Sequence, residues 1–319
     1  MDRFVFFGGK GGVGKTTVSS AYAHKCALAG VETLLVSTDP AHSTADVFDQ
    51  PFDDDPTPVE GYDALSVMEI DPEEAVDDHM MSIRRALDDQ VSPAIVNEIN
   101  RQIELAHRTP GAHEAALFDR FIDVMRECDE FDRVVFDTSP TGGTLRLLSL
   151  PEYLGGWIDR LLDKRQKSVD LYEKAAIGDR EPRRSQVGDP IIARLQGRKE
   201  NFEFAGETLR SDASFFLVLN PDQLSVRETG RAVEQLRGYD LSVSGLVMNR
   251  MTPEPDPDEN GRGARFLRDR IETERERLRE AREEIDPPIV ATIEARVREV
   301  KDDLLEPVAE EIEIDVTRE

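Results

Sequence analysis

The stretch GGKGGVGKTT, residues 8–17, decides the fold of this chain. It follows the apolar run Arg3–Phe7 and precedes a segment that reads as a helix from Lys15 to about Ala29, where Gly30 ends it. A glycine-rich loop between a strand and a helix lets successive backbone N–H groups surround phosphate oxygens, and the helix N-terminus adds partial positive charge. The stretch therefore predicts a P-loop that binds ATP.

Each position of this loop has an expected contact with the nucleotide. Lys15 is expected to pair with the β and γ phosphates in binding and in catalysis, and Thr16 to ligate Mg²⁺. The remaining predicted nucleotide contacts come from Gly9, Gly11, Gly12, Val13, Gly14 and Thr17. The glycine spacing also fits a dinucleotide-binding fingerprint, with Asp39 as the ribose-binding acid. That alternative gives no reason for Lys15 and Thr16 at the helix start, so it is the weaker interpretation.

A second lysine, Lys10, distinguishes this loop from an ordinary P-loop. Its side chain starts just beyond the first strand and need not fold back onto its own nucleotide. In a face-to-face homodimer it can reach the partner's phosphates and offset transition-state charge, as an arginine finger does. Lys10 is therefore predicted to be a catalytic residue that acts across a dimer.

Composition limits the partners that the chain can have. Its 66 Asp and Glu against 40 Lys and Arg give a net charge of −26, so nucleic acid is not an expected partner. No run approaches the roughly 20 apolar residues of a membrane span, and no leader peptide opens the sequence. We expect a cytoplasmic, soluble protein without a direct membrane anchor. Cys26 and Cys128 are too few for a disulfide framework and are expected to be buried.

Short apolar runs alternate with helical patterns along the chain, which predicts a doubly wound, mostly parallel α/β sheet. Beyond the first run, the expected strands are Thr33–Ser37, Leu65–Ile70, Arg133–Asp137, Ser214–Asn220, Leu241–Asn249 and Pro288–Thr292. A Pro/Asp-rich loop is followed by a predicted helix over Ala264–Ile285, whose narrow apolar stripe favours a solvated helix laid on the domain over a coiled coil.

We expect residues 1–319 to form one P-loop ATPase domain with two helical insertions, at about 71–128 and 144–210. The insertions are predicted to build a subdomain that receives a client or partner. Their apolar residues are Met80, Met81, Ile83, Leu87, Ile95, Ile99, Leu154, Trp157, Ile158, Leu161, Leu162, Ile191, Ile192 and Leu195. The same residues fit the buried faces of ordinary amphipathic helices equally well.

Four motifs in the chain resemble those of the ArsA family. KGGVGKTT (10–17), STDPAHS (37–43), DTSPTGGTLRLL (137–148) and VMNR (247–250) look like its deviant P-loop, switch I, switch II and adenine-contact segments. The family contains arsenical-pump ATPases and ATPases that target tail-anchored proteins. The resemblance therefore implies a P-loop ATPase of the deviant Walker A class that works as a homodimer.

The resemblance also implies roles for single residues. Asp39 would orient the attacking water, although an Asp before Pro40 can instead cap a turn. Asp137 would hold Mg²⁺ directly or through water. Asn249 would contact the adenine edge, although a strand-end Asn can also cap the following loop. The chain has Gly143 where the family commonly has a polar residue, which leaves the coupling segment open.

Three biological roles fit these observations, and each requires a different partner. The first is capture of hydrophobic, tail-anchored clients and their delivery to a membrane receptor. The second is to energise a metalloid pump, which needs about three soft thiolates where this chain offers two distant cysteines. The third, a ParA/MinD-like spatial organiser, needs a basic patch or amphipathic end helix, and the acidic tail Glu306–Glu319 supplies neither.

The family's closing adenine loop is poorly kept, so no residue is assigned there.

The acidic, lysine-poor composition supports the hypothesis of a halophilic archaeal source. In molar salt the Debye length is about 3 Å, so self-repulsion of the surface is screened. We expect the ATPase rate and the folded fraction to rise together between dilute buffer and about 1 M KCl. Circular dichroism and phosphate release across a KCl series measure both, and full activity in dilute buffer would remove this hypothesis.

Overall fold

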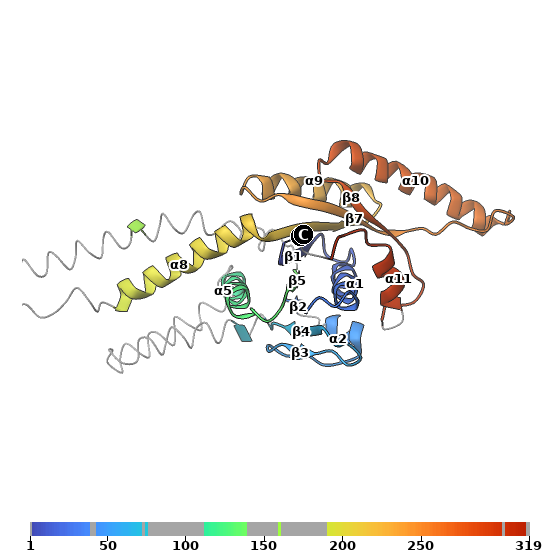
Figure 1. Cartoon of the computed structure of the whole chain (residues 1–319). Helices are drawn as coiled ribbons and strands as arrows, with labels where there is room; N and C mark the ends of the chain where they lie inside the picture. Colours follow the sequence, from blue (N-terminus) through green and yellow to red (C-terminus); the bar gives the residue numbers. More distant parts are fainter. Residues whose placement is uncertain are drawn as a thin grey trace, which may run out of the picture.

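Eight strands form one sheet in the computed structural model, which describes residues 2–38, 43–71, 74–75, 112–138, 159–160, 190–301 and 304–316 (Figure 1). The strands are β1 Phe4–Gly8, β2 Thr33–Ser37, β3 Thr57–Pro58, β4 Leu65–Glu69, β5 Arg133–Asp137, β6 Ala213–Leu219, β7 Val243–Met251 and β8 Ile289–Glu294. Their order is β3-β4-β2-β5-β1-β6-β7-β8, with every neighbouring pair parallel except β3 and β4. The predicted doubly wound, mostly parallel α/β fold is confirmed.

The helices cover both faces of this sheet, as crossover connections between parallel strands require. One face carries α1 (Lys15–Leu28), α2 (Ser43–Phe48) and α11 (Leu305–Glu310). The opposite face carries α5 (Ala112–Glu127), α8 (Pro190–Ser211), α9 (Gln223–Arg237) and α10 (Arg262–Glu284). In Figure 1 α5 and α8 lie on one side of the strands and α1 and α11 on the other.

The central strands are buried on both faces, which explains their nearly continuous apolar sequences. Along β1, Phe4 and Phe6 enter one core, whereas Val5 and Phe7 enter the other. The Phe6 ring stacks on Phe136 of β5 at 4.5 Å between centroids and on Phe215 of β6 at 5.0 Å. This aromatic row joins the three central strands and fixes the register on which the site at their ends depends.

The predicted strands, and the helices predicted over 15–29 and 264–285, agree with the structure within a few residues, whereas β3 and the short helices α2 and α11 were not predicted. Gly30, at φ 75, ends the helix after Leu28, and its N–H donates to Ala27 O at 2.9 Å. The strand β3 was not predicted, because two residues carry no alternation of apolar and polar side chains. It pairs antiparallel with β4 at the sheet edge.

The long charged helix lies on the domain, as its narrow apolar stripe predicts. α10 buries Ala264, Ile271 and Ala281 and contacts α9 and β7. Glu274 is also buried. Its carboxylate accepts two hydrogen bonds from Thr252, one from the backbone N–H and one from the side-chain hydroxyl, both at 2.7 Å. The carboxylate therefore ties α10 to the segment that follows β7.

Part of each predicted helical insertion is described. α5 falls in the first interval and α8 in the second, and the two helices pack through Phe118 and Phe202, whose ring centroids are 5.9 Å apart. Arg198 adds an ion pair to Asp119 at 3.1 Å. Of the apolar residues predicted to receive a client, Ile191, Ile192 and Leu195 belong to α8, and the others lie outside the described residues, so the subdomain stays a prediction. Within the described ranges, every helix is too short or too polar to cross a membrane.

A buried guanidinium joins the two ends of the described chain. Arg133, at the start of β5, is 1% exposed and donates to the carbonyl of Asp2 at 2.6 Å and to that of Val316 at 2.9 Å. On α1, Tyr22 donates to the carbonyl of Asp315 at 3.0 Å, and Lys25 to that of Ile312. The described part of the acidic tail, up to Val316, is therefore packed on α1.

Candidate nucleotide site

Parallel strands bring the predicted site residues to one edge of the sheet. The registers pair Phe7 of β1 with Asp137 of β5, and Ser37 of β2 with the same Asp137. Since these strands run in parallel, their carboxyl ends and the loops that follow them meet there. The P-loop leaves β1 at this edge, directly beside Asp137.

The P-loop has the open curvature that a phosphate group needs. Gly9 leaves β1 against the carbonyl of Val218 on β6, and the loop then turns through Gly11 and Gly12. A Cβ atom built on Gly11 or Gly12 would meet no heavy atom within 4 Å, so the loop surrounds open space. This cradle, at the N-terminus of a 14-residue helix, fits an anionic ligand.

Lys15 and Thr16 occupy the first turn of α1, where the motif places them. Lys15 Nζ donates to the carbonyl of Lys10 at 3.3 Å, so its ammonium lies over the loop. Thr16 Oγ1 donates to Asp137 Oδ2 at 2.6 Å, which brings together the two predicted Mg²⁺ ligands. A hydroxyl and a carboxylate are hard oxygen donors, and this pair beside a phosphate cradle fits Mg²⁺.

Asn249 lies near the end of β7 and contacts the P-loop. Its side chain is 5% exposed, and Nδ2 donates to the carbonyl of Val13 at 2.7 Å. Its Oδ1 accepts from the N–H of Arg250 at 2.9 Å, a contact within β7 and not with the Pro-rich loop that the alternative prediction had it cap. The amide therefore holds both the loop and the strand end, and its contact with adenine stays a prediction.

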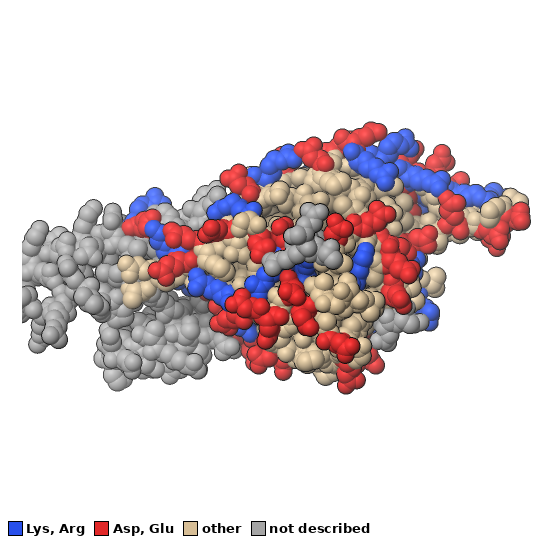
Figure 2. Space-filling view, in the orientation of Figure 1, with Lys and Arg blue, Asp and Glu red and all other residues tan. Residues whose placement is uncertain are grey.

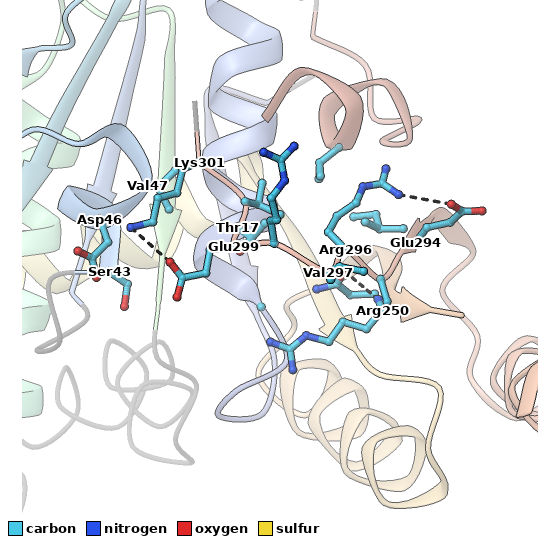
Figure 3. Close-up of a pocket in the computed structure, with 17 residues that line it drawn as sticks. Thr17, Ser43, Asp46, Val47, Arg250, Glu294, Arg296, Val297, Glu299 and Lys301 are labelled. Atoms are coloured by element: carbon cyan, nitrogen blue, oxygen red, sulfur yellow. Dashed lines mark hydrogen bonds and ion pairs between the residues drawn. The ribbon is translucent and has the colours of Figure 1, made fainter. Parts of the chain in front are cut away.

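A cavity of about 440 Å³ opens beside Asn249 (Figure 3). Gly14 and Thr17 line it from the P-loop and α1, and Ser43, Asp46 and Val47 from α2. The far wall is formed by residues 293–301, which are the last two residues of β8 and the segment that follows it. Its volume and mixed polar and apolar lining suit the nucleoside part of a nucleotide.

Sequence reasoning missed this far wall. The segment lacks the family's adenine-loop motif, so none of its residues was assigned. One signal was available, since the segment follows the last strand of a parallel sheet and must emerge at the site edge. Ion pairs hold this segment in place of the motif. Arg296 pairs with Glu294, and Lys301 with Glu299 (Figure 3). Arg296 also pairs with Glu311, which follows α11.

Lys10 does not turn toward its own loop. Its Nζ lies 3.2 Å from Glu228 Oε2 on α9, in an ion pair that the sequence did not suggest. Asp39 and Gly143 lie outside the described residues, together with residues 40–42 and 139–148 of the switch segments, so their roles stay predictions. After β2, the last described residue before the gap is Thr38, whose backbone N–H donates to the carbonyl of Asp137 at 3.3 Å.

The two cysteines are buried, as predicted, and lie on opposite faces of the sheet. Cys26 belongs to the core under α1, and Cys128 to the core under α5. Burial raises the pKa of Cys26 to about 11, and burial also raises the pKa of Cys128. Both thiols are therefore protonated at neutral pH and are poor ligands for a soft metalloid.

The fold and the site together define a P-loop ATPase. A glycine loop with Lys and Thr begins the first helix, and an acidic residue ends a neighbouring parallel strand. Over residues 2–312 the chain matches the family of anion-transporting ATPases, or ArsA ATPases. The chain belongs to this family, which confirms the resemblance of its four motifs.

Its relatives include proteins named as an arsenical pump-driving ATPase and as ASNA1 or GET3 ATPases. A protein of Aquifex aeolicus (strain VF5) with the name of an arsenical pump-driving ATPase is 34% identical, over 87% of this chain and 88% of the relative. The ATPase ASNA1 homolog of Dictyostelium discoideum is 35% identical, over 80% of this chain and 74% of its own length. ATPase GET3A of Arabidopsis thaliana is 33% identical, over 78% of this chain and 67% of its own length.

The geometry of the cradle predicts different effects at two of its glycines. Gly14 has φ 90, and a Cβ there would lie 2.4 Å from Asn249 Nδ2, so Gly14→Ala should lower the unfolding free energy by about 1–3 kcal/mol. Gly11→Ala is the matched control, with a stability change within about 0.5 kcal/mol. Urea unfolding measures both, and equal stability of the two variants would contradict the strained contact.

Proposed function

We propose that this chain is an ATP-hydrolysing homodimeric switch that captures hydrophobic, tail-anchored proteins and delivers them to a membrane receptor. The observation that carries the chemistry is the 2.6 Å contact between Thr16 and Asp137 beside an open P-loop. It supports the proposal because it brings a hydroxyl and a carboxylate, which are donors that suit Mg²⁺, together beside the P-loop. Bound Mg²⁺ would neutralise charge that develops on the phosphates.

Each residue of the site has a task in this proposal. Backbone N–H groups of the P-loop and the Lys15 ammonium bind the phosphates. Thr16 and Asp137 hold Mg²⁺, and Asp39 orients the attacking water. Asn249 and the neighbouring cavity receive the nucleoside. Lys10 leaves its own subunit and offsets transition-state charge at the partner's nucleotide.

The choice of a protein client over a metalloid rests on the thiols. Arsenite binding needs about three soft thiolates in one place. Cys26 and Cys128 lie in separate cores, and burial keeps both protonated. The pump-subunit alternative retains support from the name of the Aquifex aeolicus relative. The spatial-organiser alternative has less support, because the described part of the acidic tail packs on α1.

Substitution of Lys10 tests the dimeric mechanism. Lys10→Ala should lower kcat by at least about 10³-fold, because a cation supplied across an interface contributes that much to phosphate transfer. Nucleotide affinity should change little, since Lys15 and the backbone still bind the phosphates. Phosphate release and isothermal titration measure these quantities, with Lys199→Ala on α8 as a lysine control remote from the loop. Unchanged turnover in Lys10→Ala would remove the mechanism.

The client hypothesis is tested by comparing two nucleotide states. Asp39→Asn should trap the ATP-bound dimer, and its pull-down from lysate at native salt should be enriched in single-span membrane proteins relative to the ADP-bound wild type. Quantitative mass spectrometry measures the enrichment. If ATPase activity of the purified wild type instead rises with arsenite, and Cys26→Ser with Cys128→Ser abolishes that rise, the pump function replaces this proposal.

A further inference from the structure

The ion pair between Lys10 and Glu228 connects the P-loop to α9. Lys10 Nζ and Glu228 Oε2 lie 3.2 Å apart, and the two side chains are 40% and 38% exposed. The Oε2 atom itself is buried and accepts no hydrogen bond from the described residues, so the contact is electrostatic. Lys10 is the loop lysine assigned above to the partner's nucleotide. Its ammonium group pairs with a carboxylate of its own subunit. It does so although the glycines of the phosphate cradle follow Lys10 directly in the sequence.

The fold fixes the position of Glu228. β6 pairs with β1 up to Gly8, so the helix that follows β6 starts next to the P-loop. Asp222 caps that helix by accepting from the N–H of Ser225 at 2.9 Å. Val226 and Thr229 lie on the buried face of α9, and Glu228 lies beside that face, on the flank of the helix. The carboxylate is therefore held by the scaffold, whereas the lysine stem is flexible.

We propose that Glu228 is a positioning residue, which holds Lys10 off its own subunit's phosphates and releases it to the phosphates of a partner subunit. This inference rests on the proposed function, in which Lys10 acts across the dimer. A partly exposed ion pair is weak enough to break when a nucleotide with several negative charges approaches. It is also strong enough to bias the lysine while no partner is present.

The holding contact must oppose dimer formation, because two such pairs break for each dimer formed. An exposed ion pair changes an equilibrium by about 1.4- to 5-fold, so two pairs together change it by about 2- to 25-fold. Removing the carboxylate should therefore tighten the ATP-dependent dimer by a factor in this range. It should do so only when Lys10 is present.

Sedimentation of the full chain with Mg²⁺ and a non-hydrolysable ATP analogue measures the dimer dissociation constant. Glu228→Gln should lower it by about 2- to 25-fold at constant salt. The matched control is Glu234→Gln, which removes the same charge from the exposed pair with Arg237 on the same helix and should leave the constant unchanged. In the Lys10→Ala background, Glu228→Gln should have no effect. Glu228→Asp, which keeps the charge, should stay near the wild type.

Several outcomes would overturn the proposal. A weaker dimer in Glu228→Gln would mean that Glu228 supports the interface. Two further results would mean that Glu228 does not act through Lys10. The first is a dimer dissociation constant of Glu228→Gln equal to that of Glu234→Gln. The second is an equal effect of Glu228→Gln with and without Lys10→Ala. These results leave the proposed function intact if Lys10→Ala still abolishes turnover. A wild type that does not dimerise with the analogue would overturn both, whatever Glu228→Gln does.

Discussion

The register of β1 against β5 is the constraint on which the site depends. It brings Asp137 beside the loop that follows Phe7, so that Thr16 can donate to the carboxylate across 121 residues of sequence. The stacked rings of Phe6, Phe136 and Phe215 oppose a slip of either neighbouring strand. A shift by one residue would turn these rings to the other face and separate the hydroxyl from the carboxylate.

The loop separates its two lysines in space. Lys15 lies over its own cradle, and Lys10 points to α9. Acidic side chains cover much of the face in Figure 2, and basic ones gather along α10. Two copies, each with a net charge of −26, repel one another unless salt screens them. Any association of two copies would therefore depend on the salt concentration.

The parts of the site that the sequence predicts are those with local signals. The P-loop is a contiguous motif, and Asp137 ends an apolar run, so both could be placed before any tertiary contact was known. Glu228 could not, because one glutamate among the charges of α9 has no signal of its own and acquires its partner only when β6 pairs with β1. The wall formed by residues 293–301 also depends on tertiary packing, through Arg296 and Glu311.

The carbonyls that Arg133 binds have a consequence for the order of events during synthesis. One acceptor is at residue 2 and the other lies 183 residues beyond the arginine. At roughly 5–20 residues per second, the ribosome needs about 10–40 s to make the second acceptor after it has made the arginine. During that interval the guanidinium lacks one of the two carbonyl acceptors that it has in the folded domain. The complete set of its hydrogen bonds can therefore form only after residue 316 has been made.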